Sequence, residues 1–128
     1  MDLRPHHIGL VVRDLEKSTA FYHALGFETV QELYNDDDSR AIRFLELGGF
    51  RLELFWYAET PASAVPTGRA VGYRHLALRT YDIDETFATL KAKGLLPDDA
   101  AIRDAPAGFR LLFFRDPDGL EVEIMQEA

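Results

Sequence analysis

Cysteine is absent from this chain of 128 residues. Its absence excludes disulfide bonds, thiolate metal sites and a cysteine nucleophile. Two other catalytic patterns are missing as well, because no glycine-rich phosphate loop follows a strand-like segment and no serine lies in a nucleophile-elbow sequence. Phosphate binding through such a loop and serine-dependent hydrolysis are therefore not expected.

Positive charge is also scarce. The chain has 14 Lys and Arg against 22 Asp and Glu, which gives a net charge of −8. A surface of this sign repels phosphate backbones and anionic lipids, so neither nucleic acid nor a membrane is expected as a partner. The sequence has no long uncharged apolar run and no basic apolar leader, and we expect a cytoplasmic protein that acts on a small molecule.

What the chain does contain is a repeat. Its length and 47% hydrophobic residues suit one compact domain. Within it, HHIGLVV at 6–12 is echoed by RHLALRT at 74–80, so that an offset of 68 pairs His7 with His75. The match continues through an aspartate, an apolar-spaced segment and a glycine in each copy. Each copy therefore predicts a strand, a capped helix and a glycine that ends the helix.

A second echo follows the first. GFRLELF at 49–55 is answered by GLEVEIM at 119–125, and this offset of 70 pairs Glu53 with Glu123. β-rich runs precede these segments, at 27–34 and 40–48 in the first copy and at 100–104 and 109–115 in the second. The sequence thus predicts an α+β protein of two tandem βαβββ modules. Module one spans about 1–57, a Pro- and Gly-containing linker spans 58–72, and module two spans 73–128.

The paired histidines and glutamates fall on one kind of face. Side chains alternate along a strand, and in each module one face is apolar while the opposite face carries the histidine and the glutamate. A lone strand histidine is more often a half-buried core residue, and a lone glutamate is more often solvated. The same pair in the same module position twice favours a metal site instead, in which a cation neutralises two partly buried carboxylates. Imidazole and carboxylate donors suit zinc, nickel, cobalt, manganese or iron.

Two further histidines have no such counterpart. Arg74 stands where the second module would repeat His6, and Lys91 stands where it would repeat His23. We expect His6 to be a surface neighbour of the first strand and His23 to lie on the surface of the first helix.

These segments resemble the vicinal oxygen chelate superfamily, which includes glyoxalase I, extradiol dioxygenases, fosfomycin-modifying enzymes, methylmalonyl-CoA epimerase and metal-free antibiotic-binding proteins. The resemblance rests on HHIGLVVRDLEKSTAFYHALGF, LELGGFRLELF, GYRHLALRTYDID and FFRDPDGLEVEI. It implies an open, cupped mixed β-barrel with helices outside and one divalent metal ion within. The ligands implied by position are His7, Glu53, His75 and Glu123.

The resemblance also implies an activity. His/Glu/His/Glu is similar to the ligand set of bacterial glyoxalase I, which implies a metal-dependent lyase or isomerase. Members that use glutathione usually carry an arginine and an asparagine where Val11 and Tyr57 stand here, so we expect weak or no turnover of a glutathione adduct. A homodimer is expected, with each site built from modules of one chain or of two.

The chemistry expected of such a site is enediolate formation. A divalent ion could bind adjacent oxygens of a small α-hydroxycarbonyl or ketoaldehyde–thiol adduct and acidify the C–H between them. Glu123 or Glu53 would then act as the acid/base. The alternatives are another metal enzyme, such as an epimerase or an extradiol-type dioxygenase, and a non-catalytic binding protein.

Overall fold

The computed structural model describes residues 1–61 and 70–128. The chain forms two compact units, Met1–Ala62 and Ser63–Ala128, and each is described by itself. Most of the linker predicted at 58–72 lies outside the described residues. No helix in the described ranges is long and apolar enough to span a membrane.

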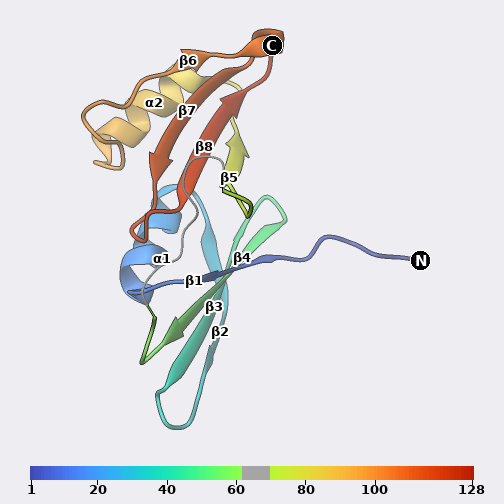
Figure 1. The fold of residues 1–128 in the computed structure, drawn as a ribbon, viewed down its shortest axis with the longest axis vertical. Coiled ribbons are helices and arrows are strands. Elements are labelled where there is room, and N and C mark those ends of the chain that lie inside the picture. The colour runs from blue at the N-terminus through green and yellow to red at the C-terminus, as the bar shows by residue number, and fades with distance from the viewer. Residues whose placement is uncertain (62–69) are drawn as a thin grey trace. The chain divides into compact units, whose positions relative to one another are not determined.

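The first unit contains one helix and one four-stranded sheet (Figure 1). Its elements are β1 (Ile8–Val11), α1 (Leu15–Ala24), β2 (Glu28–Tyr34), β3 (Arg40–Leu47) and β4 (Phe50–Tyr57). The strand order is β1-β4-β3-β2, in which β1 runs parallel to β4 and the other neighbours are antiparallel. The helix crosses from β1 at one edge of the sheet to β2 at the other, and β3 and β4 then bring the chain back beside β1.

The second unit repeats this arrangement. Its elements are β5 (His75–Arg79), α2 (Ile83–Ala92), β6 (Arg103–Asp104), a 3-10 turn (Pro106–Gly108), β7 (Arg110–Arg115) and β8 (Glu121–Gln126). The strand order is β5-β8-β7-β6, and β5 runs parallel to β8 just as β1 runs parallel to β4. The α+β class and the two βαβββ modules predicted from the repeat are confirmed.

One predicted strand is much shorter than expected. The run at 100–104 forms a ladder only at Arg103 and Asp104, which pair with Leu111 and Arg110. A turn ends at Ala100, whose N donates to Pro97 O at 3.0 Å, and residues 101 and 102 form no ladder. The prediction was therefore wrong for residues 100–102.

Both helices begin and end where the sequence predicts. The side chain of Asp14 accepts from Lys17 N at 3.0 Å, and that of Asp82 accepts from Glu85 N at 2.9 Å. Such N-cap bonds satisfy donors that have no partner within the helix. Each helix is followed by a glycine in the left-handed region, Gly26 (φ 104°) or Gly94 (φ 72°), a conformation that other residues adopt only with strain.

Each helix packs on the apolar face of its own sheet. The buried strand residues on these faces include Leu52, Leu54, Val122 and Ile124, and the buried helix residues include Tyr22 and Ile83. Burying each of these leucine side chains contributes about 2 kcal/mol. Because this face is occupied by the helix, the histidine and glutamate side chains lie on the opposite face of each sheet.

The hairpins that precede the glutamates differ between the units. Gly48 (φ 55°) and Gly49 (φ 82°) form a tight two-residue connection between β3 and β4, a geometry that needs positive φ at both positions. Between β7 and β8, Oδ1 of Asp116 instead accepts from Asp118 N and Leu120 N, both at 2.9 Å. Either turn fixes the strand register and so the position of the glutamate that follows.

Candidate metal centre

The first unit brings His7 and Glu53 together. The parallel register of β1 and β4 places Gly9 opposite Glu53, so His7 lies two residues earlier on the same face. The small residue between them leaves room for the imidazole to reach the carboxylate. Nε2 of His7 lies 2.6 Å from Oε2 of Glu53, and the side chains are 33% and 13% exposed.

The second unit builds the same pair from His75 and Glu123. Here Ala77 is the small residue opposite the glutamate. Nε2 of His75 lies 2.7 Å from Oε2 of Glu123, and the side chains are 32% and 10% exposed. Two modules with different sequences therefore arrive at nearly the same distance and the same burial, which indicates a common purpose for the pair.

The chemistry of these pairs fits a divalent cation. Each places one imidazole nitrogen and one carboxylate oxygen in contact, at 2.6 or 2.7 Å, and both donor types bind first-row divalent ions. A nearly buried carboxylate needs a positive partner, and the imidazole supplies one only while it is protonated. Within residues 1–61 and 70–128, no three or more His, Cys, Asp or Glu side chains form a group that could hold one ion. Each unit by itself thus offers two candidate ligands, and the four-residue site stays a prediction.

A phenylalanine supports each histidine, and sequence reasoning missed both. Phe44 on β3 pairs with Glu53, and its ring meets that of His7 edge-on, with centroids 5.5 Å apart and planes at 89°. Phe113 on β7 pairs with Glu123 and meets His75 at 5.6 Å and 76°. These phenylalanines are 69 positions apart, so neither the offset of 68 nor that of 70 pairs them.

His6 is exposed beside the first strand, as the sequence predicts. Its Nδ1 also lies 2.7 Å from Nδ1 of His7, a contact that the sequence did not predict. The contact therefore joins a residue assigned to the surface directly to a candidate ligand. His23 is exposed on α1, and its Nε2 lies 2.8 Å from the hydroxyl of Thr29.

Aromatic and charged side chains flank the first pair along β4. Phe55 lies opposite Val11 of β1, and its ring stacks on that of Tyr57 with planes at 10° and centroids 6.3 Å apart. On the other side of Glu53, Nε of Arg51 donates to Oε1 of Glu46 at 2.9 Å. The face that carries His7 thus has an apolar aromatic end and a charged end.

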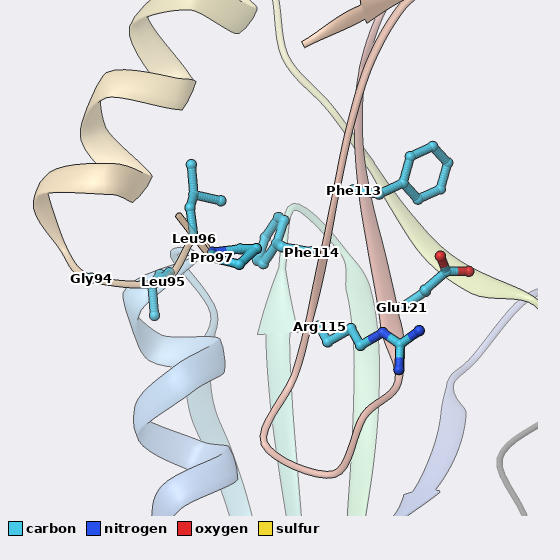
Figure 2. A pocket seen from close by; sticks show the side chains of 8 residues that line it. All are labelled: Gly94, Leu95, Leu96, Pro97, Phe113, Phe114, Arg115 and Glu121. Carbon is cyan, nitrogen blue, oxygen red and sulfur yellow. The ribbon is translucent and has the colours of Figure 1, made fainter. Parts of the chain in front are cut away.

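A pocket of about 490 Å³ in the second unit lies beside the second pair but does not contain it. It is lined by Gly94–Pro97, Phe113–Arg115 and Glu121. Figure 2 shows the side chains of Phe114 and Pro97 close together, whereas Phe113 and Glu121 point to the other side of the strands. Because neither His75 nor Glu123 lines this space, we assign the candidate chemistry to the paired residues and not to the pocket.

Comparison with known proteins places the chain in a family. It is 37% identical over 125 residues to the uncharacterized protein YwkD of Bacillus subtilis (strain 168), covering 95% of each chain. A solved glyoxalase family protein from Enterococcus faecalis matches with a TM-score of 0.79 and 30% identity, covering 95% of this chain and 96% of that one. The trypanothione-dependent glyoxalase I of Leishmania major matches with a TM-score of 0.70 and 25% identity, covering 98% and 88%. Residues 4–124 match the family described as Glyoxalase/Bleomycin resistance protein/Dioxygenase superfamily, and the chain belongs to that family.

Proposed function

We propose that this protein is a metal-dependent lyase or isomerase of the glyoxalase I type, with one divalent ion held by His7, Glu53, His75 and Glu123. The observation that carries the proposal is the repeated His–Glu pair, with nitrogen–oxygen distances of 2.6 and 2.7 Å in two separate modules. Membership of a family that includes a described glyoxalase I supports the choice of reaction.

The proposed reaction moves a proton between neighbouring carbons of a small α-hydroxycarbonyl. A bound divalent ion would supply the positive charge that holds the two oxygens and acidifies the C–H between them. Glu53 or Glu123 takes the proton from one carbon and returns it to the next. The low exposure of both carboxylates, 13% and 10%, excludes most water from this transfer.

The residues beside the first pair favour a substrate whose thiol part is not glutathione. Val11 and Tyr57 occupy positions where an arginine and an asparagine are expected for glutathione, and Tyr57 stacks on Phe55. These side chains present an apolar surface in place of charged and amide groups. The similar glyoxalase I that is described as trypanothione-dependent supports a family in which the thiol varies. A ketoaldehyde adduct of another thiol is therefore the proposed substrate class, in the cytoplasm.

Metal analysis tests the proposed ligands. Protein purified without a histidine tag should contain close to one divalent ion per site. His75→Ala and Glu123→Ala should each lower the zinc affinity at least tenfold, because each removes one of four ligands. His23→Ala is the matched control, since this exposed imidazole bonds only Thr29 in the described residues, and it should leave the affinity unchanged. Undiminished metal content in both ligand variants would contradict the assignment.

A substrate screen tests the reaction. Protein loaded separately with nickel, cobalt, manganese, zinc or ferrous iron is offered ketoaldehyde adducts of several thiols, and products and deuterium exchange at the substrate carbon are followed. We expect exchange with a non-glutathione adduct and little with the glutathione adduct. Oxygen-dependent ring opening of a catechol with iron alone would favour a dioxygenase. Tight binding without exchange in any metal form would favour a binding protein.

A further inference from the structure

We propose that Arg79 recognises a carboxylate on the part of the substrate that does not react, and that it thereby selects a small thiol acid as the thiol component. The inference rests on the proposed function, because it concerns the substrate of the same site. Its starting point is the second unit by itself, in which Arg79 ends β5, the strand that begins at His75.

Arg79 lies on the face of the second sheet that carries His75 and Glu123. Side chains alternate along β5, so His75, Ala77 and Arg79 share that face. The parallel register places Ala77 opposite Glu123 and Arg79 opposite Met125. Because a strand rises about 3.3 Å per residue, the backbone of Arg79 lies about 7 Å beyond the level of the glutamate. A substrate bound at the His–Glu pair therefore reaches this arginine with any group that extends along the strand.

A loose ion pair and an aromatic ring hold the guanidinium of Arg79. Its Cζ lies 5.4 Å from the centre of the Tyr81 ring, a distance typical of a cation–π contact. Its Nη1 lies 3.8 Å from Oε2 of Glu127, which is beyond hydrogen-bond distance. Arg51 and Arg110 differ, because they donate to carboxylates at 2.9 and 2.7 Å. The ring thus positions Arg79, while the long ion pair leaves its donors able to bind another carboxylate.

The ion pair with Glu127 is easily exchanged for a closer one. The two side chains are 55% and 56% exposed, and ion pairs with this exposure contribute little to stability. A substrate carboxylate can accept two parallel N–H···O bonds from a guanidinium, a stronger interaction than the one that it replaces. Glu127 therefore competes with the substrate for Arg79, and its charge lowers the affinity for anions.

The equivalent place in the first unit is apolar. The offset of 68 pairs Arg79 with Val11, which is 56% exposed and lies opposite Phe55. The whole chain carries a net charge of −8, which repels anionic substrates. The guanidinium of Arg79 offsets this repulsion on the face that carries the second pair. A substrate with an uncharged tail gains nothing from it, so Arg79 is a determinant of specificity for charge.

The position of Arg79 favours the thiol part of the substrate as the carrier of the carboxylate. In the proposed reaction, the two oxygens of the α-hydroxycarbonyl face the ion, and the substituents of the reacting carbons extend away from it. In a ketoaldehyde–thiol adduct, one of these substituents is the carbon chain of the thiol. A thiol acid such as 3-mercaptopropionate carries its carboxylate a few bonds beyond the sulfur, which suits the spacing of about 7 Å along β5.

Equilibrium binding of two hydroxy acids tests the recognition. 2-Hydroxyadipate and 2-hydroxyhexanoate offer the same hydroxy-acid oxygens to an ion and differ only in a distal carboxylate. Calorimetry with zinc-loaded wild-type protein should show the diacid bound about tenfold more tightly. Arg79→Gln should abolish this preference without changing the affinity for 2-hydroxyhexanoate, and Arg79→Lys should keep part of it. Glu127→Gln should enlarge the preference about two- to threefold, because it removes the competing carboxylate.

A charge control and a kinetic measurement accompany the binding experiment. Lys91→Gln removes one positive charge from the exposed surface of α2, the helix that packs on the apolar face of the sheet, and it should leave the preference unchanged. In turnover of the methylglyoxal adduct of 3-mercaptopropionate, Arg79→Gln should raise KM about tenfold and retain kcat. The same variant should leave both constants unchanged for the adduct of 2-mercaptoethanol, which carries no charge.

Three results would overturn the role of Arg79 and leave the proposed function intact, provided that the zinc-loaded protein still catalyses deuterium exchange. They are the absence of a preference in the wild-type protein, an equal preference in the wild-type protein and Arg79→Gln, and equally weakened binding of both hydroxy acids in that variant. The last would indicate a structural role. Wild-type protein that binds no zinc or other divalent ion would overturn the proposed function itself, and with it the role of Arg79.

Discussion

Phe44 and Phe113 support the two histidine rings in the same way, although no sequence repeat at the obvious offsets links them. Both meet the imidazole edge-on, an arrangement that the charge distribution of aromatic rings favours. Phe113 is itself held by Arg103, whose guanidinium carbon lies 4.9 Å from the centre of the phenylalanine ring. A supported imidazole loses less conformational freedom when it binds an ion, so these phenylalanines should contribute to affinity without touching the metal.

Removing either ring should therefore weaken metal binding. An edge-on aromatic pair contributes about 0.5–1.5 kcal/mol, so Phe44→Ala and Phe113→Ala should each lower the zinc affinity by about two- to twelvefold. Chelator competition measures the affinity, and urea unfolding measures stability separately. Phe87→Ala is a suitable control, because it removes a half-buried phenylalanine of α2 and should change stability alone. Wild-type affinity in the Phe44 and Phe113 variants would show that the edge-on contacts have no role.

The sequence is enough to predict which histidine pairs with which glutamate. It is not enough to predict the side chains that contact each histidine. Alternation along strands and the two echoes are enough to place His7 with Glu53 and His75 with Glu123. Phe44 and Phe113 depend on hairpin register, which the different turns shift by one position. The contact of His6 depends on a side-chain torsion, and a pattern of residue types carries no information about it.

Among the secondary-structure elements, β3 and β7 occupy equivalent places but carry different residues toward their helices. Leu112 of β7 is fully buried, as expected of a strand under a helix. Its counterpart on β3 is Arg43, which is only 7% exposed. The arginine donates to the hydroxyl of Thr19 at 2.9 Å and to Oε1 of Glu16 at 3.1 Å, so it ties β3 to α1.

Several contacts keep Arg43 charged in this position. Burial opposes the charge, but hydrogen bonds to Glu16 and Tyr34 leave the pKa of Arg43 raised above the ordinary arginine value. Its Nε lies 2.6 Å from Oε1 of Glu32, an ion pair without the alignment of a hydrogen bond. A raised folded-state pKa means that this stabilisation is complete below the unfolded value and is lost only in strong alkali.

Two substitutions of Arg43 should have different effects on stability. Arg43→Ala removes the ion pairs and leaves a cavity between β3 and α1, and it should lower the free energy of unfolding by about 2–3 kcal/mol. Arg43→Leu fills the space with the residue type that the second unit uses and should cost less than about 1 kcal/mol. Urea unfolding near pH 7 measures both. An equal loss for leucine and alanine would show that the charge of Arg43, and not the filled volume, holds the helix.

Most elements of the fold could be predicted because their signals are local. Asp14 and Asp82 cap helices through bonds to residues three positions on, and alternation marks the strands. The strand predicted at 100–104 failed because ladder length at a sheet edge is set by the neighbouring strand, and β7 pairs with only two residues there. The buried charge of Arg43 could not be predicted locally either. It depends on contacts with Thr19 and Glu16 of α1, and the equivalent position of the second unit is Leu112.

At the scale of the whole molecule, the open question is whether each proposed metal site is built by one chain or by two. Each presents one His–Glu pair, and a four-ligand site needs one pair from each type of unit. The partner of the first unit can come from the same chain or from a second copy. We expect a homodimer, and the two arrangements differ in how damaged chains complement one another.

Mixing two variants distinguishes the arrangements. His7→Ala damages the first unit and Glu123→Ala damages the second, so a dimer of one chain of each, with sites shared between chains, contains one intact site. Metal content and activity per mixed dimer should then recover to about half of the wild-type value. Mixing His7→Ala with Glu53→Ala is the matched control, because both changes lie in the first unit and no shared site escapes damage. Recovery in the first mixture alone would establish sites built by two chains. If subunit exchange is demonstrated with differently labelled chains and neither mixture recovers, each site is built within one chain.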